Sequence, residues 1–153
     1  MAQVAIIVNG LPDPRKSELA RTLGLVLGCP VLQPKTVEDA LHMQTGPVVD
    51  RASLRDLAAQ TIWRTAGLIE AGVIVDASWT TDDAEVVGAG LELAGTPRTV
   101  EVWCGGAAGR GGADGGGASG TGPIGVNPVV RVDGFDGVDM DALVVEISAQ
   151  FGV

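Results

Sequence analysis

The chain has 153 residues, of which 46% are hydrophobic, and this size favours one globular domain spanning residues 1–153. Its formal net charge is -9, so we expect no nucleic-acid partner, because a nucleic-acid surface needs a basic face that displaces phosphate counterions. No apolar run approaches the roughly 20 residues that cross a bilayer, and no signal-like segment opens the chain. We therefore expect no membrane contact and a cytoplasmic location.

Apolar runs alternate with helical periodicity along the whole chain. This alternation is typical of a mainly parallel sheet whose two faces are covered by helices, so we predict a three-layer α/β domain. Strands are expected over residues 3–9, 30–33, 73–77, 98–104 and 127–132, and helices over 17–25, 36–41, 49–71, 81–94 and 140–151.

The helix expected over residues 49–71 has an apolar face and a polar face. The apolar face consists of Leu54, Ala58, Ile62, Ala66 and Ile69. The arginines of the same segment, Arg51, Arg55 and Arg64, lie elsewhere on it and are expected to form a solvated surface. The three tryptophans, Trp63, Trp79 and Trp103, are expected to pack in the core or at an edge.

The segment from Gly105 to Gly122 is of low complexity and consists mostly of glycine. Glycine loses more backbone entropy on folding than other residues, and here few side chains could be buried in return. We expect this segment to be a flexible insert between two strands.

The segment from Gly10 to Ser17 fits the phosphate-binding loop pattern Gly-x-x-x-x-Gly-Lys-Ser/Thr at every position but one. In that pattern the lysine, here Lys16, reaches the outer phosphates, and the hydroxyl, here Ser17, holds magnesium. Arg15 stands where the pattern has its second glycine, which lets backbone N–H groups close around a phosphate. Asp13 lies inside the same loop. The alternative interpretation is an ordinary helix start with an exposed lysine.

Asp76 ends the buried strand expected over residues 73–77, which follows the long helix. A carboxylate at the end of such a strand lies at the edge where parallel sheets bind ligands. Taken by itself, such a carboxylate would cap the loop before Thr80.

The order of these segments resembles that of the small P-loop kinases. That group includes predicted bacterial kinases of the AAA type, the kinase half of polynucleotide kinase, zeta-type toxins and chloramphenicol phosphotransferase. The resemblance covers nearly the whole chain and implies a P-loop NTPase-like fold that binds ATP or GTP with Mg²⁺. It assigns Lys16, Ser17 and Asp76 to the phosphates and the metal, within a loop that begins at Gly10. It also implies a small-molecule phosphoryl acceptor.

Two departures from that family pattern imply weakened catalysis. In relatives the second strand ends near an aspartate that accepts the proton of the acceptor hydroxyl, followed three residues later by an arginine. Lys35 and Glu38 correspond to these positions, so both charges are reversed. Relatives also place arginines on a helical lid after the fourth strand, whereas this chain offers Arg110 alone, set among glycines.

The sequence thus supports three functional hypotheses. The first is a nucleotide-binding protein of the small-kinase type with a degenerate Walker A loop, a truncated lid and weak phosphoryl transfer. The second is an active small-molecule kinase that uses another base, for which Asp13, Glu38 and Asp39 are candidates. The third is a nucleotide-free module on the same scaffold that binds a protein partner or a second copy of itself.

Overall fold

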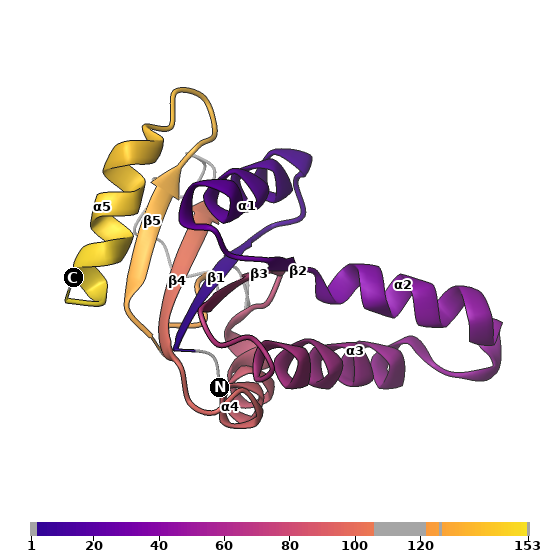
Figure 1. Ribbon diagram of the computed structural model, residues 1–153. Coiled ribbons are helices and arrows are strands. Elements are labelled where there is room, and N and C mark those ends of the chain that lie inside the picture. The colour runs from indigo at the N-terminus through magenta and orange to yellow at the C-terminus, as the bar shows by residue number, and fades with distance from the viewer. Residues whose placement is uncertain (1–2, 106–121, 126, 153) are drawn as a thin grey trace.

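The computed structural model describes residues 3–105, 122–125 and 127–152. Its centre is a five-stranded parallel sheet with the strand order β2-β3-β1-β4-β5, as Figure 1 shows. The strands are β1 (Val4–Gly10), β2 (Val31–Leu32), β3 (Gly72–Asp76), β4 (Arg98–Gly105) and β5 (Val129–Asp133). The predicted α/β class with a parallel sheet is confirmed.

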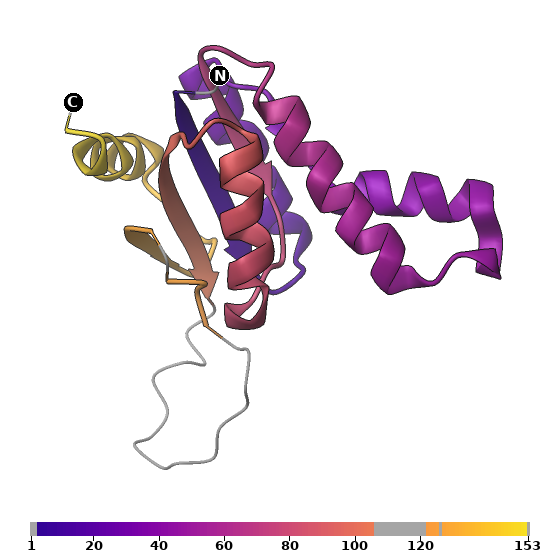
Figure 2. The same ribbon diagram turned by 90° about the horizontal axis from the view of Figure 1, so that it is seen from below.

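Helices connect the strands and cover the sheet. They are α1 (Pro14–Leu27), α2 (Pro34–Thr45), α3 (Arg51–Ala66), α4 (Ala84–Leu93) and α5 (Met140–Gln150), with single 3₁₀ turns at Gly46–Val48 and Thr81–Asp83. Figure 2 shows α4 and α5 on opposite sides of the sheet, and both ribbon views show α2 and the start of α3 projecting away from it. None of the helices that the structure describes is long and apolar enough to cross a membrane.

The core has two halves because neighbouring strand residues point to opposite faces. On one face Ile7 and Val75 pack with Ile62 and Trp63 of α3 and with Val87 of α4. On the other face the cluster consists of Ile6, Val8, Ile74, Val100, Val102, Val130 and Val132 with Leu19 and Leu23 of α1 and Leu143 and Ile147 of α5. The predicted three layers are therefore present.

Several predicted boundaries were wrong by a few residues. The long helix ends at Ala66 and not at residue 71, because the chain turns at Gly67, where an added Cβ would lie 3.1 Å from the carbonyl oxygen of Leu93. Helix α1 begins three residues earlier than predicted, at Pro14. Gly105, predicted to begin the flexible insert, is the last residue of β4 and pairs with Asp133. Residues 106–121 of that insert lie outside the described residues.

The three tryptophans are buried, as predicted. Trp63 and Trp79 stack with their ring centroids 5.7 Å apart and an interplanar angle of 17°. This pair fills the space between α3, α4 and the end of β3, and Gly90 of α4 lies against Trp63.

Gly90 and Gly88 of α4 make a matched test of this packing. A Cβ at position 90 would lie 2.0 Å from Cδ1 of Trp63, whereas one at position 88 would meet nothing within 4 Å. We expect Gly90→Ala to lower the free energy of unfolding by about 1–3 kcal/mol through overpacking. Gly88→Ala should raise it by about 0.5–1 kcal/mol, because alanine is the better helix former. Urea denaturation measures both, and equal effects of the two changes would contradict the packing described here.

Candidate functional site

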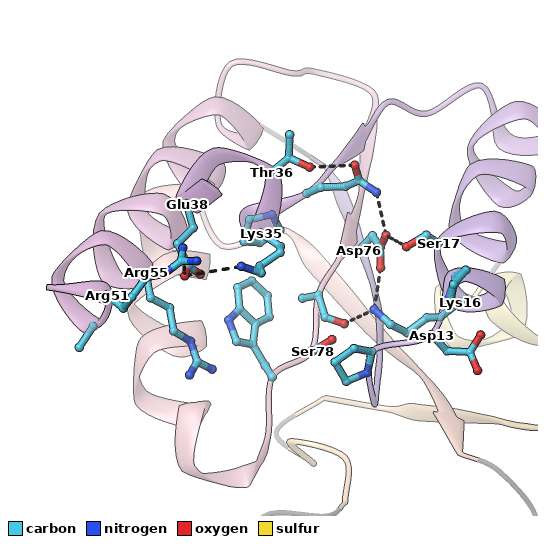
Figure 3. A pocket seen from close by; sticks show the side chains of 17 residues that line it. Asp13, Lys16, Ser17, Lys35, Thr36, Glu38, Arg51, Arg55, Asp76 and Ser78 are labelled. Carbon is cyan, nitrogen blue, oxygen red and sulfur yellow. Dashed lines mark hydrogen bonds and ion pairs between the residues drawn. The ribbon is translucent and has the colours of Figure 1, made fainter. Parts of the chain in front are cut away.

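A cleft of about 940 Å³ lies at the carboxyl ends of β1 and β3. Four segments line it: residues 12–17 before and within α1, residues 33–38 after β2, the first turns of α3, and residues 76–79 after β3. This is the edge at which parallel α/β sheets bind ligands. Figure 3 shows the side chains that point into it.

Lys16, Ser17 and Asp76 meet at one end of this cleft. The Lys16 ammonium donates to Oδ1 of Asp76 at 2.7 Å and to the carbonyl oxygen of Ala77, and both charged side chains are 4% exposed. The Ser17 hydroxyl donates to Oδ2 of Asp76 at 2.6 Å. The first turn of α1 is thereby joined to the end of β3, as Figure 3 shows. The structure thus brings together the three residues that the resemblance assigns to phosphate and magnesium.

Asp76 is held in its ionised form. Burial opposes ionisation of its carboxyl group, but hydrogen bonds from Lys16, Ser17 and Gln33 outweigh that effect, so its pKa lies below its ordinary value. The carboxylate is therefore ionised at neutral pH, and its two oxygens accept these three hydrogen bonds.

Gln33 is a member of this cluster that the sequence did not reveal. Its Nε2 donates to Oδ2 of Asp76 at 2.9 Å, and the Thr36 hydroxyl donates to its Oε1 at 3.2 Å. Gln33 immediately follows β2, which pairs with β3, so the contact with Asp76 depends on strand order. The only feature of the sequence that could have marked Gln33 is its position at the end of a strand. That position does not distinguish a site residue from an ordinary loop residue.

Arg15 does not occupy the phosphate-binding position of the loop. Its side chain is 57% exposed and bonds to Asp13, with Nε 3.1 Å from Oδ1 and Nη2 2.9 Å from Oδ2. Its guanidinium also lies over the ring of Phe135, 4.9 Å from the ring centroid. The residue that stands in place of the second glycine therefore points away from the place where a phosphate would be held.

Asp13 instead bonds to the start of helix α1. Its Oδ1 accepts from the Arg15 backbone N–H at 2.8 Å, and its carbonyl oxygen accepts from the Lys16 N–H at 3.0 Å. Hydrogen bonds to Arg15 lower the pKa of the Asp13 carboxyl group, so it is ionised at neutral pH. Pro12 and Pro14 have no N–H group to offer. The Asp13 carboxylate thus lies at the N-terminus of α1, where the helix dipole favours a negative charge.

Close packing against β4 explains why position 10 is a glycine. It has a φ of 143° and lies so close to β4 that a Cβ would be 2.4 Å from the carbonyl oxygen of Cys104. Only glycine fits this approach, which sets the direction in which the chain leaves β1 for the loop.

Lys35 lies on the wall of the cleft formed by α2 and α3. Its ammonium is 2.5 Å from Asp39 and 3.8 Å from Glu38, and its side chain is 66% exposed. An ammonium ion has no lone pair, so in this state Lys35 cannot accept a proton from an acceptor hydroxyl. Hydrogen bonds from Lys35 and Arg51 also lower the pKa of Asp39.

Arg51 and Arg55 belong to the same wall, and with side chains 50% and 53% exposed they also form the solvated helix face that was predicted. Arg51 Nη1 is 3.0 Å from Glu38 and 3.2 Å from Asp39, and Arg55 Nη2 lies 3.1 Å from Asp83. Both arginines line the cleft. Arg64, at the other end of α3, does not line it and borders a separate shallow groove.

A buried polar network supports the floor of the site. The Asn9 side chain, at the end of β1, donates to the Trp79 carbonyl at 2.7 Å and accepts from the Trp79 N–H at 2.7 Å. Asn9 also donates to Glu101 of β4, whose carboxylate accepts from the backbone N–H groups of Ile124 and Gly125. These bonds fix the chain that follows Asp76 and hence the position of Ala77, which accepts from Lys16.

The chain shares its fold with two solved structures of kinases. A solved structure of a proposed kinase from Chloroflexus aurantiacus J-10-fl matches with a TM-score of 0.72 and 18% identity, over 99% of this chain and 96% of that one. The Mycobacterium tuberculosis APS kinase CysC, solved as its Cys556Ala mutant, matches with a TM-score of 0.57 and 13% identity, over 99% of this chain and 98% of that one. No protein-family model and no curated sequence match the chain.

The buried ion pair predicts a specific dependence of stability on pH. Asp76→Asn leaves the Lys16 ammonium without its charged partner, so we expect the free energy of unfolding at pH 7 to fall by about 2–4 kcal/mol. The folded-state pKa of Asp76 lies below its ordinary value of 3.8, so its contribution is complete above that pH and is lost as the pH falls through the folded-state value.

The stability difference between the wild type and Asp76→Asn should therefore shrink below about pH 4, as measured by urea denaturation from pH 7 to pH 2.5. Asp13, Asp39 and Asp50, whose pKa values are also lowered, are present in both proteins and cancel in this difference. A difference that stays constant with pH would show that Asp76 does not titrate as described.

Proposed function

We propose that this chain is a nucleotide-binding protein of the small-kinase type, which holds the phosphates of ATP or GTP and a magnesium ion at Lys16, Ser17 and Asp76. The observation that carries the proposal is the convergence of the Lys16 ammonium and the Ser17 hydroxyl on the Asp76 carboxylate. These groups meet at the start of a helix, beside a cleft of about 940 Å³.

The donor atoms at this point suit magnesium. Mg²⁺ prefers oxygen ligands and is commonly bound by one or two protein oxygens together with phosphate oxygens and water. The Ser17 hydroxyl and the Asp76 carboxylate supply such oxygens, and Lys16 supplies a cation for the phosphates. When bound, magnesium would neutralise negative charge on the phosphates. The protein's own part is to orient the phosphates through Lys16 and to keep Asp76 ionised.

The backbone part of the site fits a polyphosphate less well than the side chains do. The Arg15 N–H is bonded to the Asp13 carboxylate, and two of the loop residues are prolines. A phosphate must displace that carboxylate to gain the N–H group. This competition supports weak nucleotide binding.

The residues around the acceptor side support weak phosphoryl transfer. The position that carries an aspartate in the family pattern is Lys35, an exposed and ion-paired ammonium. Without a base at this place the acceptor hydroxyl loses general-base assistance, which contributes about 10²–10⁴-fold in rate where it operates. Arg110, the candidate lid arginine, lies outside the described residues.

An active small-molecule kinase is the second candidate, and the position of Glu38 favours it. Glu38 lines the cleft with a side chain only 14% exposed, and Asp13 also lines the cleft. Asp39, the third carboxylate considered as a base, pairs with Lys35 and Arg51 and is not among the lining residues. In this version Glu38 would accept the proton of the acceptor hydroxyl.

Nucleotide binding can be tested by calorimetric titration with ATP or GTP in the presence of magnesium. We expect weak binding to the wild type, and its loss in Lys16→Gln, where an amide can still donate to Asp76 but carries no charge for the phosphates. Ser17→Ala should weaken binding in magnesium much more than in EDTA, because the hydroxyl is assigned to the metal. No binding to any of these proteins, with all of them folded, would exclude the proposal.

The role of Asp13 can be tested with a matched capping variant. Asp13→Ala and Asp139→Ala each remove a carboxylate that accepts from a first-turn N–H, in α1 and α5 respectively. Only Asp13→Ala frees an N–H and removes a negative charge at the proposed phosphate position, so it should tighten nucleotide binding about tenfold. Asp139→Ala should leave the affinity unchanged. Equal affinities in the two variants would mean that Asp13 does not compete with phosphate.

Phosphoryl transfer can be measured with a sensitive phosphate-release assay and a panel of alcohol acceptors. We expect turnover close to background, and we expect Lys35→Asp to raise it little, because the exchange supplies a carboxylate and no further charge stabilisation. Robust turnover that is abolished by Lys16→Gln would instead support the active kinase. A further loss with Glu38→Gln, at unchanged nucleotide affinity, would assign Glu38 as the base.

A further inference from the structure

The charges of this chain are distributed very unevenly between the cleft and the rest of the surface. Of the nine lysines and arginines among the described residues, four line the cleft, including both lysines, but only three of the eighteen described acidic residues do. Five cationic and fifteen acidic residues of the described ranges lie elsewhere. A cleft with a cationic excess in an otherwise acidic protein attracts anions, because its low-dielectric walls focus the field.

The cationic side chains of the cleft form two separate groups. Lys16 lies at the Asp76 end, where Asp76 and Ala77 bind its ammonium. Lys35, Arg51 and Arg55 lie on the opposite side, at the start of α2 and in the first two turns of α3, as Figure 3 shows. We call these three residues the cationic wall. The group near Lys16 accounts for the phosphates of the proposed nucleotide and leaves the cationic wall unexplained.

The arginines of the cationic wall are held in place by acidic residues that lie mostly outside the cleft. Asp39 pairs with Lys35 and Arg51, and Asp83 pairs with Arg55, yet neither aspartate is among the lining residues. Glu38 is the one acidic residue that both lines the cleft and pairs with this wall. The pairing orients the cations, and this reduces the conformational entropy that these side chains lose when a ligand binds.

These arginines keep donors for a further partner. Arg51 uses Nη1 in its ion pairs and Arg55 uses Nη2, whereas a guanidinium has five N–H groups. Their side chains are 50% and 53% exposed, so the remaining groups are accessible. Positions 51 and 55 are one helical turn apart on α3, which places both guanidinium groups within reach of one oxyanion.

We infer that the cationic wall binds an oxyanion group of the second substrate, so that the molecule received opposite the nucleotide is an anionic alcohol bearing a phosphate, sulfate or carboxylate. The name "second substrate" rests on the proposed function, but the anion site itself does not. A neutral alcohol or nucleoside would leave the unused donors of Arg51 and Arg55 bonded to water and would gain no charge-assisted hydrogen bond from them.

Glycerol 3-phosphate, glycerol 3-sulfate, glycerate and glycerol are suitable probes, because all four carry vicinal hydroxyls and they differ in bearing a phosphate, a sulfate, a carboxylate or no anion. Each is titrated at constant ionic strength into the full chain without nucleotide, and binding is followed by ¹H–¹⁵N chemical shifts. We expect at least one of the anionic probes to bind and to shift signals of α2 and the start of α3, and glycerol to cause no shifts. The three anionic arms identify which anion is preferred.

The variants Arg51→Gln/Arg55→Gln, Arg64→Gln and Lys16→Gln locate the site. Removing both wall arginines should weaken binding of the anionic probe at least about tenfold, since each charge-assisted hydrogen bond contributes on this scale. Arg64→Gln removes a charge from the same helix outside the cleft and should change nothing. Lys16→Gln should abolish ATP-magnesium binding while leaving the anionic probe bound. If the double variant does not fold, the two single variants, checked by thermal melting, replace it.

Loss of the anionic probe in Lys16→Gln together with its retention in the double arginine variant would overturn the inference, because the anion would then be bound by the phosphate loop. Equal binding of glycerol, or no binding of any anionic probe at millimolar concentration, would overturn it as well. Failure of ATP-magnesium to bind the wild type would count against the proposed function alone, since the anion titration is independent of nucleotide.

Discussion

The site depends on one interaction, the buried ion pair between Lys16 and Asp76. Placing two charges at 4% exposure carries a large desolvation cost, which their attraction offsets only when the remaining hydrogen-bonding groups are also satisfied. Here Ser17, Gln33 and the carbonyl of Ala77 complete the set. The contacts join α1, the residue after β2 and the end of β3, so the same pair that would serve a ligand also fixes three chain segments relative to one another.

At the start of α1, Asp13 likewise satisfies hydrogen-bonding groups from within the chain. A helix N-terminus has unpaired N–H groups, which a side chain, water or a ligand must satisfy. In this chain Asp13 accepts from the Arg15 N–H and pairs with the Arg15 side chain, which in turn contacts Phe135. These contacts, together with the bond from the Lys16 N–H to the Asp13 carbonyl, order the loop from within the chain. If a phosphate binds here as proposed, it must compete with Asp13, so the contacts that stabilise the start of α1 would lower its affinity.

Much of the fold could be predicted because its signals are local. Neighbouring residues are enough to predict the apolar strands and the motif that contains Lys16 and Ser17. Asp76 could be predicted as a candidate because it lies at the end of a strand. The order of the strands is not local, so the contact of Gln33 with Asp76 could not be predicted. The same holds for the end of α3, which is set by the approach of Gly67 to Leu93. For Arg15 the sequence raised the right question, but only the path of the loop shows the side chain pointing outward.

The arginines of α3 show how the same sequence pattern can have different consequences. Arg51, Arg55 and Arg64 all lie on the polar part of one helix, and the pattern predicts a solvated surface for all three. The first turns of α3 lie at the cleft beside the carboxyl ends of the strands, whereas its last turns pack on the sheet and border a separate groove. Arg51 and Arg55 therefore border the cleft and Arg64 does not. The cationic excess of the cleft arises from this placement, in a chain whose net charge of -9 would by itself predict repulsion of anions.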